Sequence, residues 1–316
     1  MGDRPDARPV VVTGGAGAIG SVLVRALADD GHDVRVVDNF SSGRREHLPA
    51  DGGRVTVTPA DLRVDAPFAA FRGAESVWHL AANPDIRLGT IEPSTDLEHG
   101  TVATFHVLEA ARRADVKRVL FSSSSVVYGM PTQFPTPEAY GPLLPESLYG
   151  ASKLASEGLL SAYAHCYGLR AYVFRFANII GPQMTHGVIY DFFQKLRRDP
   201  TRLEVLGDGR QAKSYLWVDD CVEGMRLAER SAHDLVNVFN LGTADQVSVR
   251  SIAERVVAAF GGTARIEYAG GERGWAGDIP RQLLAIDRIT ALGWAPRRNS
   301  SAAVDASIEA LRHASG

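Results

Sequence analysis

Several kinds of residue are scarce in this chain, and each shortage excludes a class of protein. There are only two cysteines, Cys166 and Cys221, which are too few for a disulfide framework and have no metal-ligand spacing. We therefore predict that both are core residues and that the chain holds no metal. Positive charge is not in excess either. The formal net charge is −3, so nucleic acid is not an expected partner.

Long apolar runs are absent as well. No run is long enough to span a bilayer, and the first ten residues, MGDRPDARPV, lack the apolar centre of a secretory signal. We therefore expect a cytoplasmic protein that does not bind a membrane. The length of 316 residues suits a large α/β domain with a smaller one attached.

Apolar, β-branched segments alternate with segments of helical periodicity through the first 180 residues. Continuous apolar strands joined by crossover helices are typical of a parallel sheet covered on both faces, and right-handed crossovers make such a sheet doubly wound. The predicted strands are 9–13, 33–38, 54–62, 76–82, 117–125, 170–178 and 237–242, and the predicted helices include 19–32, 96–114, 149–167, 188–198 and 248–260. The predicted fold class is α/β, a doubly wound parallel sheet with a smaller interleaved C-terminal domain.

The alternation of strand and helix weakens after residue 180. Loops such as GPQMTHG and LGDGRQ surround an amphipathic helix there, and one further sheet strand follows much later. We place the domain that carries the sheet at residues 1–178 plus about 214–243. Residues of about 179–213 and 244–316 then form the smaller domain, which we expect to bind the substrate.

A glycine-rich segment, TGGAGAIG, joins the first strand to the first helix. Gly14, Gly17 and Gly20 let the backbone turn tightly and approach a pyrophosphate, which the free N–H groups of the helix N-terminus then bind. Asp38 ends the second predicted strand, where a carboxylate accepts hydrogen bonds from a ribose 2′-hydroxyl and repels a 2′-phosphate. The pattern therefore predicts NAD rather than NADP. Asp61 and Leu62, after the third strand, are placed to reach the adenine.

Lysine is scarce, but one of the four lysines follows a tyrosine by one helical turn. Tyr149 and Lys153 lie on the same face of a predicted helix that follows the fifth strand, at the edge of the sheet where ligands bind. A free tyrosine has a pKa near 10, and both a neighbouring ammonium and an oxidised nicotinamide favour the phenolate. The pair therefore predicts a general base. Ser124, at the end of the fifth strand, could relay a proton to it, although four serines in a row leave open which one acts.

The order of these segments along the chain points to a known family. TGGAGAIG, DNFSSG, HLAA, SSSSVVYG, Tyr149-x-x-x-Lys153, RFANIIGP, GDGRQAKSYLWVDD and LGWAP resemble the extended short-chain dehydrogenase/reductase superfamily, with its Rossmann fold and NAD-dependent epimerases and dehydratases. Within it they look most like the UDP-glucose (UDP-galactose) 4-epimerases, over nearly the whole chain. The resemblance implies NAD contacts at Gly14, Gly17, Ala18, Ile19, Gly20, Asp38, Asn39, Ser42, Gly43, Asp61, Leu62, Leu80, Ala81, Ala82, Ser122, Tyr149 and Lys153.

The same resemblance implies a reaction and a substrate. Tyr149 would take the proton of the sugar 4-hydroxyl through Ser124, hydride would pass from C4 to NAD, and it would return to the other face of a 4-keto sugar. The substrate would be a nucleotide sugar, UDP-hexose in type, and Lys213 and Arg273 would meet its diphosphate. The implied substrate contacts are Ser124, Ser125, Asn178, Val188, Lys213 and Arg273. Similar proteins are homodimers through two helices, here residues 96–114 and 149–167.

Other reactions within the superfamily stay open as alternatives. A dehydratase would carry an Asp-Glu pair where this chain has Ser125-Val126. A decarboxylase would carry a glutamate at the same strand end. A glucuronate epimerase would carry an arginine soon after the GP dipeptide. These residues are absent here, which favours epimerisation of a neutral hexose over the alternative enzymes. A regulator that only binds NAD would lack the Tyr149/Lys153 pair.

Gly100 departs from the pattern of the family. Most relatives carry an asparagine at the aligned position, and that side chain is thought to shape the backbone near the active site. Glycine removes its hydrogen bonds and loosens the helix. We therefore expect this position to distinguish the chain from ordinary 4-epimerases, with a specialised substrate as one outcome.

Overall fold

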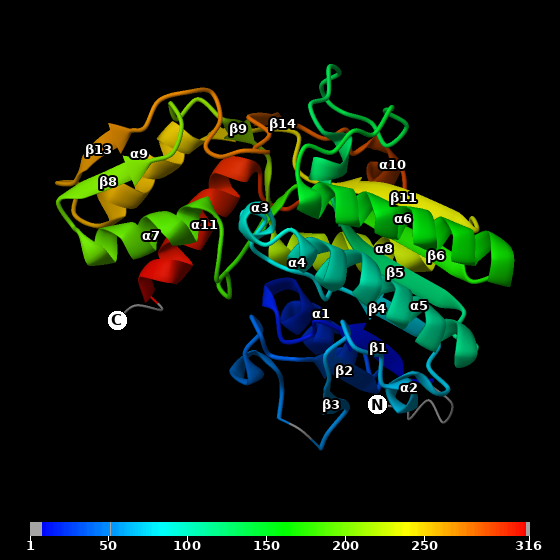
Figure 1. Cartoon of the computed structure of the whole chain (residues 1–316). Coiled ribbons are helices and arrows are strands. Elements are labelled where there is room, and N and C mark those ends of the chain that lie inside the picture. The colour runs from blue at the N-terminus through cyan, green and yellow to red at the C-terminus, as the bar shows by residue number, and fades with distance from the viewer. Residues whose placement is uncertain (1–7, 51, 314–316) are drawn as a thin grey trace.

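Seven parallel strands form the main sheet of the computed structural model, which describes residues 8–50 and 52–313. The strand order is β3-β2-β1-β4-β5-β6-β11, and every neighbouring pair is parallel. The predicted doubly wound parallel sheet is therefore confirmed (Figure 1). The strands are β1 (Val10–Thr13), β2 (Val34–Asp38), β3 (Val55–Pro59), β4 (Ser76–His79), β5 (Arg118–Ser124), β6 (Arg170–Phe176) and β11 (Val236–Leu241). Residues 1–7 of the N-terminal segment analysed above lie outside the described residues.

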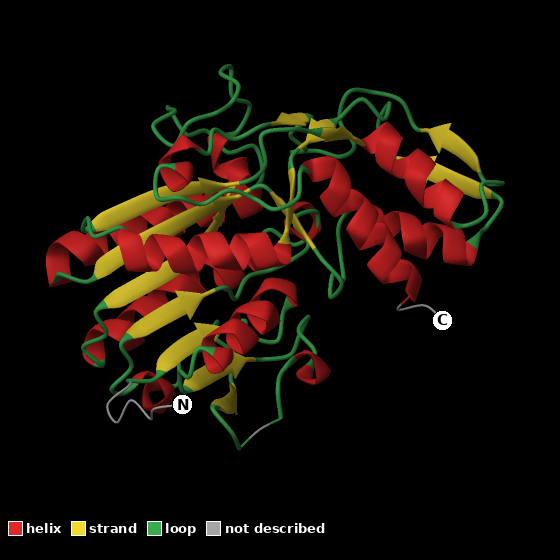
Figure 2. Cartoon of the chain, turned by 180° about the vertical axis from the view of Figure 1, so that it is seen from behind, coloured by secondary structure: helices red, strands yellow, loops and turns green. Residues whose placement is uncertain are grey.

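Helices cover both faces of this sheet, which is why its strands are apolar throughout. One core packs α1 (Ala18–Asp29) and α8 (Val218–Ser231) on one face. A second core packs α2 (Phe68–Phe71), α5 (Ala103–Arg113) and α6 (Leu148–Tyr167) on the opposite face. Figures 1 and 2 show the sheet between these two layers. Burial on both faces favours continuous β-branched runs such as the VVVT of β1, all four residues of which are buried.

A third core lies beside the sheet in a smaller C-terminal unit (Figure 1). It is built from the parallel pair of β8 (Arg202–Val205) and β13 (Arg265–Tyr268), together with α7 (Val188–Arg198), α9 (Val249–Ala259) and α11 (Ser300–His313). Short strands link the two units: β7 (Asn178–Ile180) pairs with β10 (Tyr215–Trp217), and β9 (Ala212–Lys213) pairs with β12 (Val247–Ser248) and β14 (Arg281–Gln282). The remaining helices are η1 (Arg45–His47), α3 (Leu88–Ile91), α4 (Ser94–Asp96), η2 (Leu97–Val102), η3 (Ser125–Tyr128) and α10 (Asp287–Thr290).

The chain passes between the two units more than once. After β7 it builds α7 and β8, returns to the main sheet with α8 and β11, and then leaves again for α9. The separate cores support the division at residues 1–178 plus 214–243 against 179–213 plus 244–316, which we keep as a proposal.

Two local predictions differ from the structure. Cys221 is buried as predicted, but the prediction of a core position for Cys166 is wrong, because this residue lies on the exposed side of α6. The segment predicted as one helix over residues 96–114 is three pieces, α4, the π-helical turn η2 and α5. Among the described residues no helix combines the length and the apolar character that crossing a membrane requires.

Close packing against α6 explains why the π-helical turn contains Gly100. A Cβ atom at Gly100 would come within 2.8 Å of the Ser152 Cβ and closer still to its hydroxyl. The α6 helix, which carries the Tyr149/Lys153 pair, therefore lies directly against the backbone of η2. The asparagine of the family's pattern has no room at this position unless α6 moves.

A chain of hydrogen bonds also ties η2 to the centre of the sheet. The Thr104 hydroxyl donates to the Gly100 carbonyl (2.7 Å), so the imidazole Nε2 of His79 must donate to Thr104 (3.0 Å). The His79 Nδ1 then accepts from the Thr13 hydroxyl (2.7 Å). Burial lowers the pKa of His79 to about 3, which keeps the ring neutral as this chain requires.

The chain topology fixes where a ligand can lie. The strand order reverses between β1 and β4, and ligands of such sheets bind beyond the carboxyl ends of the strands at this point. The loops after these two strands are in close contact, because a Cβ at Gly14 would lie 2.7 Å from the Ala81 Cα. Gly14 also has a φ of +68°, in the left-handed region that favours glycine.

The contact between η2 and α6 can be tested by adding one methyl group. Gly100→Ala should lower the free energy of unfolding by about 1–3 kcal/mol, the usual cost of overpacking a closed contact. Gly158→Ala is the matched control on α6, where a new Cβ meets no atom within 4 Å. It should stabilise by about 0.5–1 kcal/mol, since glycine is a poor helix former. Urea unfolding followed by circular dichroism measures both, and equal effects would contradict the packing described.

Candidate functional site

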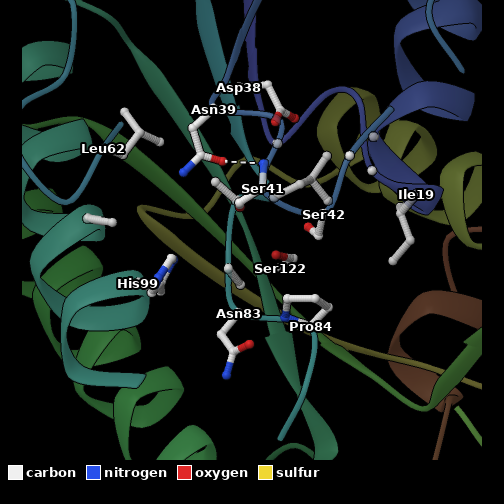
Figure 3. A pocket seen from close by; sticks show the side chains of 18 of the residues that line it. Ile19, Asp38, Asn39, Ser41, Ser42, Leu62, Asn83, Pro84, His99 and Ser122 are labelled. Atoms are coloured by element: carbon white, nitrogen blue, oxygen red, sulfur yellow. Dashed lines mark hydrogen bonds between the residues drawn. The ribbon is translucent and has the colours of Figure 1, made fainter. Parts of the chain in front are cut away.

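A cleft runs along the carboxyl ends of the strands, at the point where the strand order reverses. Its walls come from the residues after β1 to β5, from the start of α6 and from the segment at 183–186. Every residue predicted as a cofactor contact lines this cleft. Figure 3 shows side chains that line the cleft, and those labelled extend from Asp38 at one end to Asn83 and Pro84 at the other.

The glycine loop presents unpaired backbone donors to the cleft. Gly17 is the N-cap of α1 and has no side chain to occupy the N–H groups of the first turn. Gly20 faces the loop itself, since a Cβ there would lie 2.8 Å from the Gly15 Cα. The loop therefore lies close to the helix start, and the free N–H groups and the positive end of the helix dipole suit a pyrophosphate.

Asp38 joins this loop to the second strand. Its Oδ2 accepts from the Ala16 N–H (2.9 Å) and its Oδ1 from the Phe40 N–H (2.8 Å), so the carboxylate is held in one orientation. Each carboxylate oxygen has a further lone pair, which leaves capacity to accept from ribose hydroxyls. The next residues form a tight turn in which the Asn39 side chain accepts from the Ser41 N–H (3.0 Å; Figure 3). These residues and the glycine loop fit the adenosine and pyrophosphate parts of NAD.

The predicted adenine end has an additional cation. Arg63 donates to the Asp61 carboxylate, with 2.6 Å between Nη2 and Oδ2, and both side chains line the cleft. The hydrogen bond from Arg63 is the main reason why the pKa of Asp61 is lowered. Arg63 and His99 were not predicted as lining residues, since neither follows a strand directly.

Tyr149 and Lys153 lie in the same cleft. The side chain of Ser147 caps α6 by accepting from the Gly150 N–H (3.0 Å), which fixes the helix start two residues before Tyr149. Lys153 is 2% exposed, and its Nζ donates to the Ser122 carbonyl (2.6 Å). The ammonium also lies 5.6 Å from the centre of the Tyr149 ring, so the spacing of four residues brings the pair together as predicted.

Burial dominates the protonation of both groups. It lowers the pKa of Lys153 to about 7, against the opposing effects of Asp96 and Glu157. It raises the pKa of Tyr149, and the carboxylate of Asp96 raises it further. The phenol pKa is therefore raised in the chain alone, rather than lowered by the neighbouring ammonium as the sequence suggested. The desolvated ammonium therefore loses its proton more readily than that of a free lysine.

The four serines at the end of β5 differ in what their hydroxyl protons do. Ser122 donates to the His79 carbonyl and Ser123 to Glu157. Ser125 is held by the side chain of Gln282. The Ser124 oxygen accepts from the Val126 N–H (3.4 Å), and within the described residues its proton has no acceptor. Ser124 is therefore free to donate.

None of the predicted substrate residues is among those that line the cleft. Ser124 ends β5, Ser125 begins η3, and the others come from β7 and the segments after it. Asn178, at the start of β7, donates to the side-chain oxygen of Gln282 (2.8 Å). Because Gln282 in turn holds Ser125, these residues form one connected group. Val188 begins α7. The structure therefore brings the cofactor set and the Tyr149/Lys153 pair together in one cleft, whereas the predicted substrate set does not line it.

Both predicted diphosphate cations already have partners. Lys213 pairs with the buried Asp278 (2.6 Å), and Arg273 pairs with Glu146 (2.6 Å) on the surface. An anionic ligand would have to compete with these carboxylates.

A buried ion pair supports α6 from below the site. Arg175 on β6 donates to both oxygens of Glu157, at 3.0 Å and 2.7 Å, one helical turn after Lys153. Ser123 donates to the same carboxylate (2.5 Å), and Arg175 also donates to the Tyr128 hydroxyl (3.0 Å). All four side chains are buried. This network fixes the strand end and the helix that carry the candidate catalytic residues.

Other residues line the cleft without having been predicted. Asn83 and Pro84 follow the HLAA segment directly, so their position after β4 was a usable signal. Gln183 and His186 come from the loop after β7, which belongs to the other unit, and only the folded chain brings them to the cleft.

The comparisons with known proteins agree with this geometry. The model of the NAD dependent epimerase/dehydratase family matches residues 10–242. A UDP-glucose 4-epimerase from Mycolicibacterium smegmatis is 34% identical over 96% of this chain and 99% of its own length. A crystal structure of a UDP-galactose 4-epimerase has a TM-score of 0.88, with 41% identity over 97% of this chain and 99% of that one. The UDP-N-acetylglucosamine 4-epimerase of Methanobrevibacter ruminantium M1, solved with UDP-N-acetylmuramic acid, has a TM-score of 0.87 and 26% identity, covering 98% and 100%.

The chain therefore belongs to the NAD-dependent epimerase/dehydratase family, as its segments suggested. The family description gives NAD as the cofactor, which agrees with the prediction from Asp38 and the glycine loop. The closely packed glycines, the unpaired N–H groups of α1 and the orientated Asp38 all fit this cofactor.

The buried Arg175–Glu157 pair gives a test of how α6 is held. Glu157→Gln leaves the Arg175 charge without its partner in the core, so the free energy of unfolding should fall by about 3–5 kcal/mol. Glu204→Gln is the control, because Glu204 pairs with Lys195 on the surface (3.1 Å), and it should cost less than about 1 kcal/mol. Chemical unfolding monitored by tryptophan fluorescence measures the difference. A small loss in both variants would mean that the network does not hold the helix.

Proposed function

We propose that this member of the NAD-dependent epimerase/dehydratase family is an epimerase of a nucleotide-activated hexose, UDP-glucose/UDP-galactose in type, which inverts C4 through a transient 4-keto sugar. The observation that carries the proposal is the position of the Tyr149/Lys153 pair. It lies in the same cleft as the glycine loop and Asp38. The hydroxyl of Ser124, at the end of β5, is free to donate. The relatives named above that are most similar in sequence act on UDP-glucose or UDP-galactose by their names.

Each residue of the site has a role in this proposal. The glycine loop and Asp38 hold NAD, which when bound supplies a hydride acceptor and a positive charge beside the phenol. Tyr149 accepts the proton of the sugar 4-hydroxyl, and Ser124 relays it because its own proton is not engaged elsewhere. Lys153 stays fixed by the Ser122 carbonyl, so its charge lies beside the phenol whenever it is protonated.

The substrate lies between the two units in this proposal. In this proposal the substrate contacts Ser125, Asn178 and Val188. Lys213 leaves its partner Asp278, and Arg273 leaves its partner Glu146, to bind the diphosphate. Since the Lys213–Asp278 pair is largely buried, Lys213 is the cation with the more fixed position. A cytoplasmic location stays a prediction of the sequence.

A second candidate is another nucleotide-sugar reaction in the same cleft. The similarity to a UDP-N-acetylglucosamine 4-epimerase, at a TM-score of 0.87, favours a sugar with a bulkier 2-substituent. A dehydratase, a decarboxylase or an epimerase of a glucuronate or specialised sugar belongs to the same alternative.

We also propose a homodimer through the helices at residues 96–114 and 149–167. Large apolar side chains are exposed along these helices: Leu97 (55%), Phe105 (44%) and Tyr167 (56%). Apolar side chains grouped on neighbouring helices are typical of an interface with another protein chain.

The function can be tested by supplying candidate substrates one at a time. Purified protein incubated with UDP-glucose should form UDP-galactose without net consumption of NAD, as read by NMR. UDP-N-acetylglucosamine and UDP-glucuronate are supplied in separate reactions, and loss of water or carbon dioxide in any of them would favour the second candidate. Tyr149→Phe should lower turnover by about 100- to 10,000-fold, the usual contribution of a general base, while NAD still binds. Full activity of that variant would exclude the role given to Tyr149.

The dimer can be tested by light scattering coupled to size exclusion. The chain should elute with twice its mass of 34.0 kDa. Phe105→Asp should shift it toward the monomer, since a charge cannot be buried there without a partner. Val64→Asp is the control, at a residue that is 78% exposed and lies outside both helices. A monomeric protein, or an equal effect of both changes, would contradict the proposal.

A further inference from the structure

Asp96 is a buried carboxylate that the proposed reaction does not use. It ends α4, directly before the π-helical turn, and it is 1% exposed. Its Oδ1 accepts from the Asn83 side chain (3.0 Å), whereas its Oδ2 is buried without a hydrogen-bond partner among the described residues. A carboxylate held in this way is costly unless a nearby charge compensates it.

The carboxylate cannot turn toward water. Gly89 lies against it, since a Cβ there would come within 3.0 Å of the Asp96 Cγ, and the same Cβ would be 3.6 Å from the Leu148 Cβ. Asp96 is therefore enclosed between the α3 segment and the first turn of α6. That turn carries Tyr149, and the next one carries Lys153.

Few charges act on Asp96. Lys153 on α6 and His99 on η2 attract it, and Asp85 in the loop before α3 repels it. Burial lowers the pKa of His99, and Asp85 is exposed, which leaves Lys153 as the buried cation that can compensate Asp96.

The same relation holds from the side of Lys153. Against the effect of burial, Asp96 gives the largest increase in the pKa of Lys153, ahead of Glu157. Glu157 is already bound by Arg175 through two hydrogen bonds. The other titratable groups near Lys153 are Tyr149 and the neutral His79.

We propose that Asp96 is a positioning residue for the Tyr149/Lys153 pair, as the fixed counter-charge that keeps the Lys153 ammonium charged inside the cleft. The hydrogen bond to Asn83 adds a second effect. Asn83 lines the cleft, and its side chain also donates to the Asp85 carbonyl (2.8 Å) and accepts from the Asp85 N–H (3.0 Å). Asp96 therefore stabilises the charge of Lys153 on α6. Through its hydrogen bond with Asn83, it also orients the end of the cleft opposite Asp38. Only the catalytic consequence rests on the proposed function.

Removing this charge has a defined sign. A negative charge stabilises the protonated forms of both Lys153 and Tyr149, so a neutral isostere at position 96 lowers both pKa values. The Lys153 ammonium then loses its proton at a lower pH. Below that pH the pair is unchanged, and above it the cleft has lost the ammonium.

The scarcity of lysine makes the measurement direct. Protein labelled with [13C]lysine has only four side chains to resolve, Lys117, Lys153, Lys195 and Lys213, and Lys153→Arg identifies the signal of interest. In the full-length chain the Lys153 Cε signal should titrate near pH 7. In Asp96→Asn its midpoint should fall by about one pH unit, while the other three signals stay in place.

Asp85→Asn is the matched control. Asp85 contacts the same Asn83, but its carboxylate is 49% exposed, so the Lys153 midpoint should move little. An unchanged midpoint in folded Asp96→Asn, or an equal shift in both variants, would overturn the proposal. Neither measurement uses a sugar substrate. A failure of the product assay and a failure of this inference are therefore distinguishable.

A double-mutant cycle tests the same pairing through stability. Lys153→Met leaves the Asp96 carboxylate buried without its partner. Asp96→Asn leaves the Lys153 ammonium buried without its partner. The urea midpoint of the double variant should therefore be higher than the two separate losses predict. Additive losses would contradict the proposal even if Asp96→Asn folds too poorly for NMR.

Discussion

The buried ammonium of Lys153 is the constraint on which the site depends. A cation at 2% exposure requires compensating groups, and the chain supplies the Ser122 carbonyl at the end of β5, the ring of Phe121 on the same strand, and the charges of Asp96 and Glu157. The contacts of the ammonium therefore tie α6 to the end of β5, and Tyr149 lies one helical turn before Lys153 on α6.

Much of the fold was readable from the sequence, because its strands are buried on both faces. A strand such as VVVT has no polar face, so its continuous apolar run distinguishes it without ambiguity from the amphipathic helix that follows. The cofactor side was readable for a related reason. Gly14 follows β1 directly, Gly20 lies in the first turn of α1, and Asp38 ends β2, so the sheet topology brings these positions together.

The rest depended on contacts between distant segments. Gln183 and His186 reach the cleft from a loop of the second unit, and no local pattern marks that approach. The π-helical turn at residues 97–102 was not predicted either, and its Gly100 packs against Ser152 on the distant helix α6. The prediction for Cys166 was wrong because the sequence of α6 does not show which face of the helix is exposed to solvent. Gly100, which looked like a missing interaction, is instead the residue that permits this close approach.

The repeated crossing between the two units limits how such a protein can be divided. A chain that ends at residue 178 would include six strands of the main sheet but not β11, so β6 would become an edge with unpaired backbone groups. The α8 helix, which covers the sheet beside α1, would also be missing. The two units are thus not separable modules, because each depends on segments that the chain supplies only after it has visited the other.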